Sequence, residues 1–92
     1  MNADQENRLA RREIMLAYVK VLERPGDLLR VCAGVSGDGD EVRAAVEKVF
    51  DLSPFAADAV LQLQVRRFTP AQLHLTRAEL AEVERAIAED RA

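Results

Sequence analysis

The placement of proline and glycine constrains this fold more than any other feature of the sequence. The three prolines and four glycines fall at only four places: Pro25-Gly26, the segment 34–39, Pro54 and Pro70. Proline lacks a backbone N–H and clashes inside a helix, so each place ends or begins a helix. Between these breaks good helix formers dominate, and β-branched residues are not gathered into alternating runs. The sequence therefore predicts an all-α fold of about five helices.

Side chains suited to N-capping indicate where several helices begin. Asp38, with Glu41 three residues later, has the form of a capping box, and Asp40 is a competing cap. Ser53 precedes Pro54, and Thr69 precedes Pro70 with Gln72 completing a second capping box. We expect the first two helices over about residues 4–24 and 27–35. The third begins at the cap at Asp38 or Asp40 and continues through Val49. The fourth covers about residues 53–66, and the fifth runs from Thr69 to the C-terminus.

The first and last helices have the pattern of a paired arm. Along the last helix an apolar seam recurs in alternating steps of three and four residues, which is coiled-coil spacing: Leu73, Thr76, Leu80, Val83 and Ile87. The first helix has two neighbouring stripes, one through Ala17 and Val21 and one through Tyr18 and Leu22, which suggest burial from two sides. We expect the terminal helices to form a short antiparallel coiled-coil arm, with the middle helices as a small knob at one end.

Size and charge limit what such a protein can be. Ninety-two residues form one helical domain, residues 1–92, with a thin core that association with another chain would stabilise. The formal charge of −3 argues against a dedicated nucleic-acid binder. No apolar stretch approaches the roughly 20 residues of a membrane span, and the polar start is unlike a signal peptide. We expect a cytoplasmic protein without a membrane partner, whose single Cys32 fits a reducing cytoplasm of bacterial or eukaryotic type.

No catalytic or metal-binding constellation stands out. His74 lies among leucines and polar residues, Cys32 lies in an apolar run, and the two cannot supply a metal-ligand set. The loop around Asp38 and Asp40 lacks the spacing of a calcium-binding EF-hand. We therefore predict a protein that is not an enzyme and uses no cofactor or metal.

One region resembles a known family. The stretch from Phe50-Asp-Leu-Ser53 through Leu61-Gln-Leu63-Gln-Val-Arg-Arg67-Phe-Thr69 resembles the exit-gate region of the A subunit of DNA gyrase and topoisomerase IV. Glu79-Leu80 matches a pair in the long helix that follows there, and the segment 12–22 looks like the helix that enters the gate. The resemblance covers roughly residues 7–87. It implies a coiled-coil arm capped by a helical globule, two of which meet across a two-fold axis.

Departures from the family pattern exclude strand passage by this chain alone. Tyr18 lies in an apolar helix and does not match the family's cleavage tyrosine, which belongs to a separate domain. The family's DNA-binding and metal-binding parts are missing. Gln62 and Gln64 replace charged residues, and Pro54-Phe55 replaces an acidic-aliphatic pair.

These observations favour a non-catalytic homodimerisation module. Its candidate interface is Phe55, Ala59, Leu63 and Phe68, about half of which we expect in the monomer's own core. An alternative is hetero-association with a full-length gyrase or topoisomerase IV subunit, which the protein would modulate. A third hypothesis is a small DNA-associated protein that uses the pairs Arg11-Arg12 and Arg66-Arg67, although surface ion pairing is the simpler interpretation of these arginines.

Overall fold

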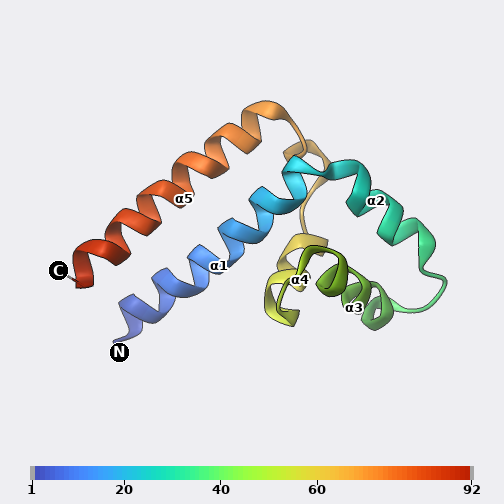
Figure 1. Cartoon of the computed structure of the whole chain (residues 1–92), viewed down its shortest axis with the longest axis horizontal. Coiled ribbons are helices and arrows are strands. Elements are labelled where there is room, and N and C mark those ends of the chain that lie inside the picture. The colour runs from blue at the N-terminus through green and yellow to red at the C-terminus, as the bar shows by residue number, and fades with distance from the viewer. Residues whose placement is uncertain (1, 92) are drawn as a thin grey trace.

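The computed structural model describes residues 2–91, which form five α-helices and one 3-10 turn and contain no strand (Figure 1). The elements in chain order are α1 (Ala3–Glu23), α2 (Pro25–Gly34), α3 (Gly39–Phe50), α4 (Pro54–Leu61), η1 (Val65–Arg67) and α5 (Pro70–Arg91). The all-α prediction is confirmed. Among the described residues, no helix has the length and apolarity needed to cross a membrane.

Capping side chains begin four of these helices. Asp38 accepts hydrogen bonds from the N–H groups of Asp40 and Glu41, so Asp38 is the cap and the alternative at Asp40 is wrong. Ser53 Oγ accepts from the Ala56 N–H at 3.1 Å, and Thr69 Oγ1 accepts from the Gln72 N–H at 3.1 Å. At α1 a capping box that the sequence analysis missed joins Asn2 and Gln5. Each cap satisfies backbone donors that a helix start otherwise leaves unpaired.

Two helix boundaries differ from the prediction. The fourth helix ends at Leu61 rather than near Arg66, because the chain turns there and continues as η1. Half-buried Leu63 and Phe68 pack against the core on either side of η1, and a straight helix could not place both there. The second helix begins at Pro25 rather than near residue 27, so Pro25 and Gly26 do not form a turn between the helices. Arg24 alone separates α1 from α2.

Helix α1 lies between the two halves of the molecule. It packs antiparallel against α5 to form the arm, and its C-terminal half also packs against α4, α2 and α3 (Figure 1). Along the predicted seam of α5, Thr76 and Val83 are buried, and Leu73, Leu80 and Ile87 are half-buried. Pairing across the arm includes Arg12 Nε to Glu84 Oε1 at 3.4 Å and an ion pair between Arg8 and Asp90. The expected burial of α1 from two sides is also confirmed.

The core is small and lies where α1 meets the three short helices. Its buried members are Ala17, Val21, Leu28, Val46, Phe50, Ala56, Ala57 and Val60. Alanines on α1 and α4 allow these helices to approach closely, and Phe50 supplies the largest buried side chain of the cluster. The molecule extends over 47 × 29 × 18 Å, because the arm projects from this core.

Candidate interaction surface

An apolar cavity opens to solvent where α1 passes into α2. Its lining consists of five apolar residues, which we call the apolar cup: Pro25, Leu28, Leu29, Val65 and Phe68. The cavity has a volume of about 110 Å³, which is far more than one water needs, yet a lining of this kind offers water no hydrogen-bond partners. Displacing water from it with an apolar group is therefore favourable.

Two walls of the cup expose large apolar side chains. Leu29 is 70% exposed and Val65 is 84% exposed, whereas Leu28 at the base is 7% exposed and belongs to the core. Adjacent residues of a helix point about 100° apart, so Leu28 and Leu29 cannot both face inward. The helix break at Leu61 places Val65 opposite α2, and Phe68 packs against the core beneath it.

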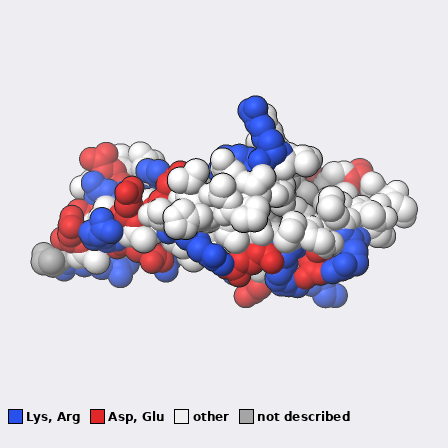
Figure 2. Space-filling model, turned by 90° about the horizontal axis from the view of Figure 1, so that it is seen from above, with Lys and Arg blue, Asp and Glu red and all other residues white. Residues whose placement is uncertain are grey.

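Charged side chains are unevenly distributed over the surface. Figure 2 looks down on the molecule from above the view of Figure 1 and shows an area over the middle with few charged side chains, from which one basic side chain projects. The arm, at the left of the same view, is covered by closely mixed acidic and basic side chains. Leu29 and Val65 are the two most exposed of the large hydrophobic residues, and exposed apolar side chains that gather at one place mark an interaction site more often than scattered ones do.

The structure separates the predicted interface residues. Phe55 lies in the first turn of α4 and is 51% exposed, but it does not line the cup. Ala59, Leu63 and Phe68 are half-buried, and both Leu63 and Phe68 pack against the core. Among the four, only Phe68 contributes to the cup. Pro25, Leu29 and Val65 were not among the predicted interface residues, although the Leu28-Leu29 pair on one amphipathic helix was a signal that one leucine faces outward.

The two arginine pairs lie at different places in the fold. Arg11 and Arg12 face Glu79 and Glu84 across the arm, at 3.8 and 3.4 Å. The Arg67 guanidinium lies over the Tyr18 ring, 5.7 Å from its centroid, and Arg66 is exposed. The four arginines therefore do not form one basic patch, and three of them are engaged with other side chains.

An ion-pair cluster lies on α2 beside the cup. Hydrogen bonds from Arg24 and Arg30 hold the pKa of Asp27 below its ordinary value of 3.8. Arg24 Nε is 2.7 Å from Asp27 Oδ2, and the Arg24 guanidinium also stacks 4.8 Å from the centroid of the Phe50 ring. These contacts join Arg24, the residue before α2, to the first turn of that helix and to the core.

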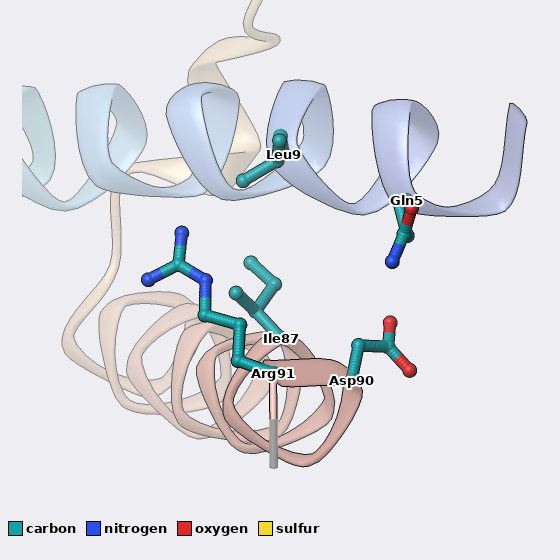
Figure 3. A pocket seen from close by; sticks show the side chains of 5 residues that line it. All are labelled: Gln5, Leu9, Ile87, Asp90 and Arg91. Atoms are coloured by element: carbon teal, nitrogen blue, oxygen red, sulfur yellow. The ribbon is translucent and has the colours of Figure 1, made fainter. Parts of the chain in front are cut away.

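A second cavity lies at the open end of the arm. It has a volume of about 110 Å³ and is lined by Gln5, Leu9, Ile87, Asp90 and Arg91. Figure 3 shows Ile87, Asp90 and Arg91 directed from α5 toward α1, with Gln5 pointing back toward Asp90. Charged and amide groups share this cavity with two aliphatic side chains, so its lining is more polar than that of the cup.

Within residues 2–91, no three His, Cys, Asp or Glu side chains gather closely enough to hold a metal ion. His74 is exposed on α5, and Cys32 is half-buried on α2. Comparison with protein-family models gives no match for this chain, and the comparison with curated proteins gives none either.

Proposed function

We propose that this protein is a non-catalytic homodimerisation module and that two copies meet through the apolar cup. The observation that carries this proposal is the exposure of Leu29 and Val65 at the rim of an apolar cavity. In a two-fold dimer each surface meets its own copy, so a projection and a hollow on the same surface complement one another. An exposed side chain from one copy would fill the cavity of the other.

The free energy gained by apolar burial in such a dimer is comparable to the cost of association. Burying the exposed parts of Leu29 and Val65, which are 70% and 84% exposed, would contribute about 5 to 9 kcal/mol over both copies, at about 1.5 to 3 kcal/mol for a side chain that passes from full exposure to full burial. Association itself costs about 4 to 15 kcal/mol in lost freedom of motion. The two terms are of similar size, so a single charge placed in the cup would prevent the dimer.

The arrangement of the chain also supports the proposal. The outer ends of α1 and α5 lie together at one end of the molecule, and the start of α2, whose residues line the cup, lies away from that end (Figure 1). Pairing through the cup would leave both arms pointing away from the contact. The same architecture, an arm that carries a dimerising globule, is what the resemblance to the gyrase and topoisomerase IV exit gate implies.

The test is the absolute mass in solution, measured by light scattering on a sizing column over a range of concentrations. We expect a mass near twice 10.2 kDa for the unmodified chain. Leu29→Asp and Val65→Asp should give monomers, whereas Val49→Asp should not, because Val49 is 43% exposed on α3 and does not line the cup. A monomer at every concentration would contradict homodimerisation and would direct attention to a different protein as the partner, with topoisomerase subunits tested first.

A further inference from the structure

Helix α5 stands apart from the core of the molecule. Neither the buried residues of the core nor the half-buried residues packed against them belong to α5. Among the helices, α1 is the one against which α5 packs extensively, and Figure 1 shows α1 lying between α5 and α4. The two buried residues of α5, Thr76 and Val83, therefore lie outside the core, on the seam that faces α1.

Helix α1 is held in place independently of α5. Its inner side, with Ala17 and Val21 in the core, packs against α2, α3 and α4. Within residues 2–91, every ion pair that α5 makes with another element is made with α1: Arg8 with Asp90, Arg11 with Glu79 at 3.8 Å, Arg12 with Glu84 at 3.4 Å, and Glu23 with Arg77 at 2.8 Å. The contacts of α5 thus form one set, which the α1 of any copy of this chain can offer.

The connection between the core and α5 is one residue long. Phe68 packs against the core and Pro70 is the first residue of α5, so only Thr69 lies between them. The Thr69 hydroxyl accepts from the Gln72 N–H at 3.1 Å, so Thr69 belongs to the same unit as the helix that it caps. A connection this short leaves the chain few ways to turn back onto itself, and short hinges are those at which neighbouring chains exchange an element.

We infer that α5 is an exchangeable helix: in a pair of copies, the α5 of each chain packs antiparallel on the α1 of the other. This is a second mode of self-association, beyond the contact proposed at the apolar cup, and it requires neither Leu29 nor Val65. The arm contacts are the same within one chain and between two, so the two forms differ in free energy mainly at the hinge and in the cost of association. Opening the arm breaks all these contacts at once, so exchange occurs when chains refold together at high concentration rather than between folded copies.

The order of charges along the arm identifies an antiparallel α5 as the helix that fits α1. The arginines of α1 that pair with α5 lie in its first half, and Glu23 is its last residue. Along α5, Arg77 is the first charged residue, and acidic residues predominate from there to Asp90. A parallel α5 would bring Arg77 toward Arg8 and Asp90 toward Glu23, and both contacts would join like charges. Opposite charges meet at both ends of the arm only in the antiparallel order, whichever copy supplies the helix.

Mixed single-cysteine chains test the exchange directly. The background carries Cys32→Ala, so that no native thiol remains, and Leu29→Asp, which removes the contact at the cup. Arg8→Cys chains and Asp90→Cys chains are unfolded in urea, refolded together at high protein concentration and treated with a short bis-maleimide linker. Because Arg8 and Asp90 face each other across the arm, exchange should give covalent heterodimers of the two chains, identified by their mass.

Positions 13 and 53 provide the matched control. The Ser53 hydroxyl donates to the Glu13 carboxylate, so these residues also face each other, but α1 and the start of α4 remain in the same copy when α5 exchanges. Glu13→Cys chains refolded with Ser53→Cys chains should therefore give heterodimers only at the level of random encounter.

A second measurement concerns the hinge. Insertion of Gly-Gly-Ser between Phe68 and Thr69 lets α5 turn back more easily onto its own α1. The protein concentration at which half of the refolded chains are dimeric should therefore rise at least about tenfold. The same insertion after Gly37, in the loop between α2 and α3, is the control and should leave this concentration unchanged. Circular dichroism of each variant verifies that its helices form.

The outcomes separate this inference from the proposed function. Suppose that the chain dimerises without unfolding, but that Arg8→Cys and Asp90→Cys chains cross-link no more than the control pair after refolding. That result would overturn the exchange while homodimerisation through the cup stands. Heterodimers above the control level, together with no dimer of the unmodified chain before unfolding, would support the exchange and contradict the cup contact. An unchanged midpoint after insertion at the hinge would also overturn the inference, since exchange at a one-residue connection depends on its length.

Discussion

Arg77 on α5 reaches Glu23 at the end of α1, with its Nη2 2.8 Å from Glu23 Oε1. This ion pair joins the two helices of the arm at the end nearest the core. It also turns the first charged side chain of α5 toward α1 rather than over the exposed face at Leu75. One contact therefore ties the first charged residue of α5 to the last residue of α1.

Removal of this ion pair should have a small effect on stability. Arg77 and Glu23 are 55% and 45% exposed, so water and salt screen their attraction. Arg77→Ala should lower the free energy of unfolding by about 0.2 to 1 kcal/mol, measured by urea denaturation. A double-mutant cycle with Glu23→Ala isolates the pairwise contribution, and a coupling energy well above this range would show that the pair is more strongly held than its exposure implies.

Two phenylalanines close together in sequence should differ sharply in their contribution to stability. Phe50 is 3% exposed in the core, whereas Phe55 is 51% exposed on α4. Phe50→Ala should lower the free energy of unfolding by about 3 to 5 kcal/mol, because it removes buried apolar surface and leaves a cavity. Phe55→Ala should change it by about 0.5 kcal/mol or less, as exposed substitutions usually do. Equal effects in thermal or urea unfolding would contradict the placement of the core.

Lys20 should stabilise the packing of α1 against the end of α3. Its Nζ donates to the carbonyl oxygens of Phe50 and Asp51, at 3.2 and 3.3 Å, where α3 leaves carbonyl groups unpaired. Lys20→Met keeps most of the aliphatic chain and removes these bonds, so it should cost about 0.5 to 2 kcal/mol of unfolding free energy. Lys48→Met, also near the end of α3, is the matched control, and a loss as large as that of Lys20→Met would count against a specific role of Lys20.

The Asp27 cluster should make part of the stability sensitive to acid. Because Arg24 and Arg30 lower the pKa of Asp27 in the folded protein, the unfolded chain takes up this proton first as the pH falls. The stabilisation is therefore complete above the ordinary pKa of 3.8 and disappears as the pH falls through the lowered folded value. Asp27→Asn should be less stable than the unmodified protein at pH 7, and the difference should close at low pH. Urea midpoints across the acid range measure it, and a difference that persisted unchanged below this pKa would refute the assignment.

Local sequence features were sufficient to predict most helix positions. Capping side chains at Asp38, Ser53 and Thr69 act within one turn of their own helix, so their effect is visible without knowledge of the rest of the fold. The seam of α5 could also be predicted, because an apolar stripe must be buried against another element and α1 was the one predicted helix of matching length.

The C-terminal end of α4 could not be predicted from local sequence features. Residues 62–66 favour a helix locally, yet the chain turns after Leu61 and the Leu63 N–H bonds to the Val60 carbonyl at 3.1 Å. Packing of Leu63 and Phe68 against the core outweighs the weak local preference, which amounts to only about 0.7 kcal/mol or less per ordinary residue.

The sequence by itself thus determined the helices, their caps and the buried stripes, because these depend on residues three or four positions apart. Only the tertiary structure decided which apolar residues are left at the surface. Leu29 and Val65 belong to segments distant in the sequence and meet at one cavity because the chain turns after α4 and α2 begins directly at Pro25. The local sequence around Leu29 or Val65 does not distinguish it from a core residue. The exposure of both side chains therefore follows from the packing of the whole chain.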